Sequence, residues 1–144
     1  MSVDAVNKAS LVRKLIIDRA GLSQAEVAAG KADPDFEAIV DALVDVHRGK
    51  EVLYGNYMET HGSEPENFCL IQHFCDTKRK YVRAENFVKL KADNKSVELV
   101  QLLDTYADMA VYSIMGVQMV MHLMNRKTAE IKKEVEGVRY EQSF

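Results

Sequence analysis

Two acidic residues stand inside an otherwise apolar stretch, LLDTYADMAVY at residues 102–112. Asp104 and Asp108 are four residues apart, so a helix would place both carboxylates on one side. Two carboxylates with this spacing can share a divalent cation such as Mg²⁺, which prefers hard oxygen ligands. The competing interpretation is that both acids face water. The spacing alone therefore predicts either a metal site or a solvated helix face.

A second group of charges lies in HFCDTKRKYVRAEN, residues 73–86. On a helix, Asp76, Lys80 and Arg83 would share one broad face, with Arg79 at its edge. Arginine binds phosphate through a planar fork, and lysine binds it as a point charge. An acid with several cations on one face suits a metal–phosphate ligand. It equally suits a ladder of surface ion pairs between successive helical turns.

A third group lies in HRGKEVLYGNYMETH, residues 47–61. On a helix, Lys50, Tyr54 and Tyr57 would lie on one side. Aromatic rings beside a cation can stack on a base while the cation holds a phosphate. The alternative is that the tyrosines border the core and keep their hydroxyl groups in water.

Apolar residues recur at helical spacing along the chain, and no stretch alternates as a strand would. The sequence therefore predicts an all-α fold, a helical bundle of three long helices plus one or two short N-terminal helices. The expected helices cover residues 4–20, 23–29, 34–59, 64–90 and 97–125. In this interpretation the chain has an N-terminal helical segment (1–33), a core helical domain (34–125) and a charged helix extension or tail (126–144).

The ends of these helices are predicted from capping residues, prolines and turns. The signals are a capping box of Ser23 with Glu26, Asp33 before Pro34, a capping box of Ser63 with Glu66, the turn at residues 92–95, and Ser96 as cap of the last helix. Gly49 and Gly55 fall inside the expected helix 34–59 and weaken its continuity.

The chain has 144 residues and a net charge of −3. These values fit one globular domain and argue against a duplex-DNA binder, which needs a concentrated basic surface. Cys69 and Cys75 would lie on different faces of a helix, so no disulfide is expected between them. No apolar run has signal-peptide length at the N-terminus, and residues 109–124 are too short and too polar for a membrane span. We therefore expect a cytoplasmic protein.

Two other patterns in the sequence resemble known sites but lack part of what those sites require. Cys69, His73 and Cys75 are zinc-type ligands, but Cys75 would point away from the other two on a helix. Residues 20–30, AGLSQAEVAAG, resemble the start of the second helix of a helix-turn-helix domain. The acidic sequence that follows would repel the phosphates of DNA, so DNA reading is not expected.

The last predicted helix is apolar on most of its faces beyond Asp108 and is rich in methionine. A helix of this kind is surrounded by other helices or by other subunits. We therefore expect a homo-oligomer, a homodimer whose last helices meet, in which changes at Met115 or Met119 alter the oligomeric state.

Three short motifs follow one another in the chain: K-x-x-x-Y-G at residues 50–55, D-x-K-R-K-x-x-R at residues 76–83, and E-x5-D-x3-D-x3-Y at residues 98–112. Their order and spacing resemble the nucleotide modification associated domain family of phages and bacteria, first class. That family is similar to the all-α nucleotide pyrophosphohydrolases. The resemblance covers roughly residues 36–120.

The resemblance implies a nucleotide site between the long helices. The implied metal ligands, for Mg²⁺ or for Mn²⁺ in its place, are Asp76, Glu98, Asp104 and Asp108, of which Asp104 and Asp108 are also the implied catalytic pair. The implied substrate-binding residues are Lys50, Tyr54, Arg79, Lys80 and Arg83. The implied reaction is metal-dependent attack of water on a (deoxy)nucleoside triphosphate, which releases pyrophosphate, in phage nucleotide metabolism or DNA-base modification.

The acidic set departs from that of the pyrophosphohydrolases, which carry E-x-x-E and E-x-x-D pairs on two helices. Here the last helix has D-x3-D, and few acids precede it. Three hypotheses therefore stay open. The first is a nucleotide pyrophosphohydrolase, the second is a module that binds a nucleotide or nucleotide signal without hydrolysing it, and the third is a helical oligomeric interaction protein.

Overall fold

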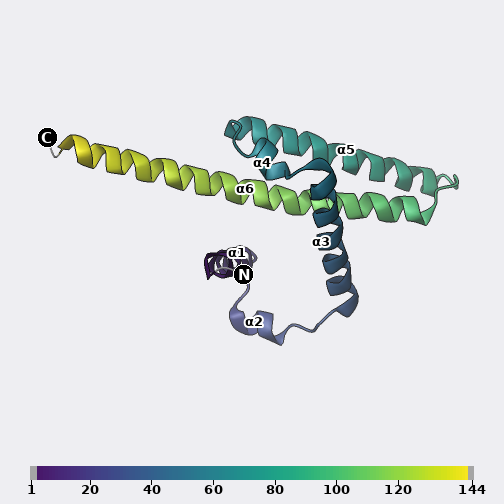
Figure 1. Ribbon diagram of the computed structural model, residues 1–144. Coiled ribbons are helices and arrows are strands. Elements are labelled where there is room, and N and C mark those ends of the chain that lie inside the picture. The colour runs from purple at the N-terminus through teal and green to yellow at the C-terminus, as the bar shows by residue number, and fades with distance from the viewer. Residues whose placement is uncertain (1–2, 143–144) are drawn as a thin grey trace. The chain divides into compact units, whose positions relative to one another are not determined.

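The computed structural model describes the backbone of residues 3–142 and the side chains of residues 8–53 and 55–137. Every regular element in that part of the chain is an α-helix, which confirms the predicted all-α class. The helices are α1 (Val3–Arg19), α2 (Gln24–Ala29), α3 (Pro34–Tyr54), α4 (Tyr57–His61), α5 (Glu66–Ala92) and α6 (Leu99–Gln142) (Figure 1). The three long helices of the prediction correspond to α3, α5 and α6.

The helices divide into two compact units, residues 1–38 and residues 39–144. The first unit holds α1, α2 and the first turn of α3. The second holds the rest of α3 together with α4, α5 and α6, and therefore contains every side chain of the candidate site described below. None of the described helices combines the length and the apolar character that a membrane crossing requires.

The starts of α2 and α3 follow the predicted capping residues. The Ser23 hydroxyl accepts a hydrogen bond from the Glu26 backbone N–H at 3.1 Å, and the Glu26 carboxylate accepts one from the Ser23 N–H at 2.7 Å. This reciprocal pair is the capping box expected from the sequence. Asp33 accepts from the Phe36 N–H at 3.1 Å, and Pro34 is the first residue of α3.

Helix α3 ends earlier than predicted, at Tyr54 rather than near Glu59. Gly55 has a φ of 77° and its N–H donates to the Glu51 carbonyl at 2.9 Å, so the chain leaves the helix through a left-handed residue. Asn56 then caps the short helix α4, accepting hydrogen bonds from the Met58 and Glu59 N–H groups at 2.9 and 3.2 Å. Glycine is needed here because a side chain would strain this backbone conformation.

Helix α5 also begins differently, and the predicted capping box of Ser63 with Glu66 is wrong. The helix starts at Glu66, and Pro65 occupies the capping position without a side-chain hydrogen bond. Proline supplies a suitable φ for a helix start, but it offers no acceptor to the free N–H groups of the first turn.

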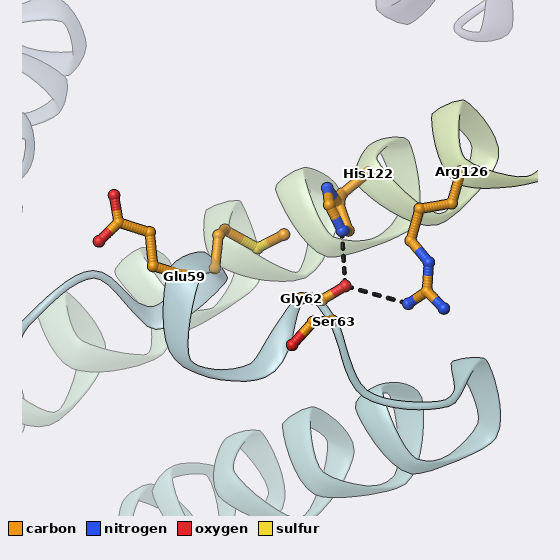
Figure 2. Close-up of a pocket in the computed structure, with 6 residues that line it drawn as sticks. Glu59, Gly62, Ser63, His122 and Arg126 are labelled. Atoms are coloured by element: carbon orange, nitrogen blue, oxygen red, sulfur yellow. Dashed lines mark hydrogen bonds between the residues drawn. The ribbon is translucent and has the colours of Figure 1, made fainter. Parts of the chain in front are cut away.

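The loop between α4 and α5 is instead held by α6. Nε2 of His122 donates to the Gly62 carbonyl at 2.7 Å, and Nη1 of Arg126 donates to the carbonyls of Gly62 and Glu64 at 3.0 and 2.6 Å. Figure 2 shows both side chains reaching the Gly62 oxygen from the same face of α6. A Cβ at Gly62 would lie 2.4 Å from the Met58 carbonyl oxygen, so the loop also depends on glycine at this position.

The predicted turn at residues 92–95 is confirmed, since α5 ends at Ala92 and Asn94 has a φ of 56°. The last helix starts at Leu99, two residues later than expected from Ser96 as its cap. It then runs without a break to Gln142, so the charged C-terminal residues extend this helix rather than form a separate arm.

Helices α5 and α6 lie side by side and antiparallel, and they form the main helix–helix contact of the chain (Figure 1). Gly116 permits the close approach, because a Cβ there would lie 2.7 Å from Nε2 of His73. The core of this unit is Cys69, Met119 and Leu123, against which Tyr57 and Met58 pack. Cys69 and Cys75 are both free, as predicted.

Candidate functional site

Three helices bring charged side chains together at Asp108. Lys50 from α3 donates to Oδ1 of Asp108 at 2.7 Å, and Lys80 from α5 donates to Oδ2 at 3.0 Å. The Asp108 side chain is 15% exposed, so both of its oxygens are engaged at the edge of the interior. One carboxylate thus holds two ammonium groups, and the three residues together carry a net charge of +1. We call Lys50, Lys80 and Asp108 the lysine–aspartate cluster.

The cluster shifts the pKa values of Asp108 and Lys50. Partial burial acts to raise the pKa of Asp108, but hydrogen bonds and positive charge from Lys50 and Lys80 outweigh it, so the net pKa is lowered. The hydrogen bond to Asp108 raises the pKa of Lys50, against a smaller opposing effect of desolvation. Asp108 and Lys50 therefore remain charged at neutral pH.

Two further ion pairs lie along the same side of α5. Arg83 is 3.7 Å from Asp104 of α6, where the Asp104 side chain is 68% exposed. Arg79 pairs with Asp76 within α5. The sequence allowed two interpretations of the charges on α5, a phosphate site or a ladder of ion pairs within the helix. Arg79 and Asp76 form such a pair within α5. Lys80 and Arg83 pair instead with acids of α6.

An aromatic surface adjoins the lysine–aspartate cluster. The Lys80 ammonium lies 5.4 Å from the centre of the Tyr112 ring, within the range of a cation–π contact. His73 stacks on Tyr112 with ring centres 6.3 Å apart, and Tyr57 meets His73 edge-on at 5.8 Å. A pocket of about 150 Å³ opens between α3 and α6, and its lining includes Lys50, Tyr57 and Tyr112. Lys50 therefore belongs both to the cluster and to the pocket.

Two buried groups on this surface lack hydrogen-bond partners among the described residues: the Tyr57 hydroxyl and Nδ1 of His73. Burial, with a further contribution from the charge of Asp76, raises the pKa of Tyr57 to about 12. Burial lowers the pKa of His73, although the nearby Asp76 acts against this shift. Both side chains are therefore neutral at pH 7, and each holds one buried polar atom without a partner in the described part of the chain. Of the two residues, Tyr57 lines the pocket.

The sequence matches no known family model, and neither a curated protein nor a solved structure shows significant similarity to it. Function must therefore be argued from the site itself.

The structure gathers some of the residues expected at the site and leaves others apart. Lys50, Lys80 and Asp108 meet directly, and Arg83 with Asp104 forms the neighbouring pair. Glu98 is exposed just before the start of α6 and takes part in none of these contacts; its N–H donates to the Gln101 side chain. The Tyr54 side chain lies outside the described residues.

The expected metal ligands do not gather into one group. Among the described residues, no three histidine, cysteine, aspartate or glutamate side chains form a group that could hold a metal ion. Asp76, Asp104 and Asp108 each face a lysine or arginine instead. As arranged, this donor set fits a resident Mg²⁺ or Mn²⁺ ion poorly, because cations already neutralise the carboxylates.

Sequence reasoning placed Tyr57 beside Lys50 but did not single out Tyr112 as a partner of Lys80, nor His122 and Arg126 as holders of the α4–α5 loop. Tyr112 is four residues from Asp108, and Arg126 is four residues from His122, so each pair shares a helix face. The sequence shows this spacing, but it does not show which helix each face packs against.

Proposed function

We propose that this chain binds a nucleoside phosphate, with the phosphates at the lysine–aspartate cluster. The observation that carries the proposal is the meeting of two ammonium groups from different helices on one carboxylate. Each ammonium has three N–H donors, and Asp108 takes one from each lysine. The remaining donors of Lys50 and Lys80 are available to phosphate oxygens, and Arg83 adds a guanidinium nearby.

The adjoining pocket suits a planar ring. Tyr57 and Tyr112 offer aromatic faces, and His47 lies at the same pocket. A base stacked against such rings gains about 1–3 kcal/mol. Because Lys50 lines this pocket as well as the cluster, one ligand could place a ring in the pocket and its phosphates on the lysines. The three motifs that resemble the nucleotide modification associated domain family support the same ligand class.

Hydrolysis of a nucleoside triphosphate to a monophosphate and pyrophosphate is the second candidate function. The observation that favours it is that Asp104 and Asp108 lie one helical turn apart beside Lys80 and Arg83. Mg²⁺ commonly enters a site with the substrate phosphates and takes only one or two carboxylates from the protein. The exposed Asp104 is suited to that role, since its contact with Arg83 is loose at 3.7 Å.

Titration calorimetry with each deoxynucleoside triphosphate and Mg²⁺ tests the binding proposal. We expect Lys50→Met and Lys80→Met each to weaken binding by roughly 10- to 100-fold, the value of a lost charge-assisted hydrogen bond. Lys78→Met is the matched control, because Lys78 is exposed on α5 two residues from Lys80. Equal affinities for all three variants, or no binding of any nucleotide by the wild type, would sink the proposal.

Pyrophosphate release from the same mixtures tests the second candidate. Turnover that needs Mg²⁺ and is lost in Asp104→Asn, with binding retained, identifies a hydrolase. Recovery of the nucleotide intact after long incubation, with binding that persists in EDTA, identifies a binding module. The two results separate the hypotheses because the first requires metal and chemistry, and the second requires neither.

A further inference from the structure

Helix α6 carries two apolar faces. The inner face, which includes Val111, Met115, Met119 and Leu123, is between 0% and 8% exposed and packs within the chain. The outer face consists of Ile114, Val117, Met121, Met124, Ile131 and Val135. Each of these side chains except Met121, which is partly buried, is close to half exposed. A soluble helix normally has one such stripe, so the outer face needs a covering partner.

The inner face changes the expectation about Met115 and Met119. Both side chains are buried inside the chain, at 8% and 0% exposure, and so are not available to a second subunit. Changing them would disturb the core of this unit before it disturbed any contact between chains. Pairing of α6 with another chain must therefore use exposed side chains, such as those of the outer face.

The C-terminal third of α6 gives a second reason for a partner. Within the unit of residues 39–144, the C-terminal part of α6 continues well beyond the N-terminal end of α5 (Figure 1). All residues from 127 to 137 are exposed, including Ile131 and Val135. Isolated helices shorter than about 12–15 residues are marginal in water, so this stretch gains little stability from its own hydrogen bonds.

The outer face has the spacing of a coiled-coil seam. Its members are separated by alternating intervals of three and four residues from Ile114 to Val135, with Thr128 at the single polar position. This repeat keeps one stripe facing a partner helix along several turns. A partner helix packs along this stripe when it carries the same apolar repeat, and the α6 helix of a second copy of this chain carries it.

The charges flanking the seam favour an antiparallel pair. In a parallel pair, Lys127 would face Lys132 of the second copy across the seam, which is repulsive. In an antiparallel pair with Met121 opposite Met124 of the second copy, Ile131 lies opposite Ile114 and no such lysine pair forms. The apolar residues of each C-terminal third then cover those of the other chain.

We propose that two copies of this chain associate through the outer faces of their α6 helices, which run antiparallel. The contact does not use Lys50, Lys80 or Asp108, and it does not depend on nucleotide binding. Each chain buries the half-exposed side chains of its own outer face, and the projecting end of each α6 gains the tertiary support that it lacks within residues 39–144.

Mass measurement by light scattering during gel filtration tests the contact. We expect a two-chain mass for the wild type at micromolar concentration and a one-chain mass for Ile131→Lys/Val135→Lys, since both side chains are exposed and contribute nothing to the core of residues 39–144. Ala129→Lys/Gly137→Lys adds the same charge to other sides of the same helix and should keep the two-chain mass. A one-chain wild type, or an equal loss of pairing in both double variants, would overturn the proposal.

Disulfide linking tests the orientation, in a Cys75→Ser background that leaves only the buried Cys69. In the antiparallel register Val135 lies opposite Ala110 of the second copy. Val135→Cys alone should therefore give no linked dimer under mild oxidation, and Ala110→Cys/Val135→Cys should give one. Linking of the single variant, or no linking of the double variant while the pair persists, contradicts the antiparallel register.

Discussion

Lys50 of α3 and Asp108 of α6 form a 2.7 Å ion pair although 58 residues separate them in sequence. Lys80 of α5 reaches the other carboxylate oxygen of Asp108 at 3.0 Å. Asp108 of α6 therefore binds one side chain from α3 and one from α5. These two contacts depend on how α3 and α5 are both positioned against α6. The same acid was singled out in the sequence because it interrupts an apolar helix face.

Replacing Asp108 with asparagine should destabilise the fold. The amide keeps an acceptor but leaves Lys50 and Lys80 together without a counter-charge, and we expect the free energy of unfolding to fall by about 1–3 kcal/mol. Urea denaturation at pH 7 measures it. Asp104→Asn is the control, because that side chain is 68% exposed and its removal should cost no more than about 0.5 kcal/mol. Equal effects at the two positions would contradict the structural role of the cluster.

The loss of folding stability at acidic pH should also depend on Asp108. Its pKa is lowered in the folded chain, so the unfolded chain takes up the proton first as the pH falls below the ordinary value of 3.8. The stabilisation is therefore present above that value and is lost as the pH falls through the lower folded pKa. Unfolding curves between pH 5 and pH 2.5 should show a shallower decline in Asp108→Asn than in the wild type.

His73 should add a separate decline at milder acidity. Burial lowers its pKa below the ordinary value of 6.5, so protonation favours the unfolded chain as the pH falls past that value. We expect the wild type to lose stability between pH 7 and pH 5 and His73→Gln to lose less over the same interval, whatever its stability at pH 7. Parallel pH profiles for the two proteins would show that His73 does not titrate differently on folding.

Local signals in the sequence predicted the parts of the fold that depend on neighbouring residues. Ser23 with Glu26 and Asp33 with Pro34 marked helix starts correctly, because a capping hydrogen bond spans only three residues. Ser63 with Glu66 has the same pattern, yet no capping box forms there. The His122 side chain, from sixty residues away, binds the Gly62 carbonyl and helps to fix that loop.

The candidate site was predictable in part for a similar reason. Helical periodicity placed Asp108, Lys80 and Lys50 on the faces that meet. It could not decide which cation would neutralise which acid, because that depends on how each helix is rotated about its axis. The expected metal site at Asp104 and Asp108 came from their spacing, and Asp76 and Glu98 were added by the family resemblance. In the structure, Asp76, Asp104 and Asp108 each pair with a lysine or an arginine instead.

The α5–α6 contact should be sensitive to a single methyl group at Gly116. A Cβ there would lie 2.7 Å from His73 Nε2, so the imidazole or the helix must shift. We expect Gly116→Ala to lower the free energy of unfolding by about 1–3 kcal/mol. Gly49→Ala is the matched control inside α3, where a Cβ would meet nothing within 4 Å. That change should raise stability by up to about 1 kcal/mol through helix propensity, and a gain at both positions would refute the close approach.

Tyr57→Phe should separate the stability of the fold from ligand binding. The Tyr57 hydroxyl is buried without a partner among the described residues. Its removal should therefore leave the free energy of unfolding unchanged or raise it by up to about 1 kcal/mol. Tyr57 also lines the pocket to which Lys50 belongs. If a bound nucleotide supplies the missing partner, Tyr57→Phe should weaken its affinity by roughly 3- to 10-fold.

Tyr57→Phe should thus weaken nucleotide binding without lowering the free energy of unfolding, a combination that a general loss of structure cannot produce. Urea denaturation and titration calorimetry on the same preparation measure both. Tyr81→Phe is the control, because Tyr81 is 59% exposed on α5 and lines no part of this pocket. A variant that is less stable than the wild type would show that the hydroxyl has a partner within the chain. A variant that binds nucleotide with unchanged affinity would place the ligand away from Tyr57, because a hydroxyl whose only partner is the ligand cannot be removed without cost to binding.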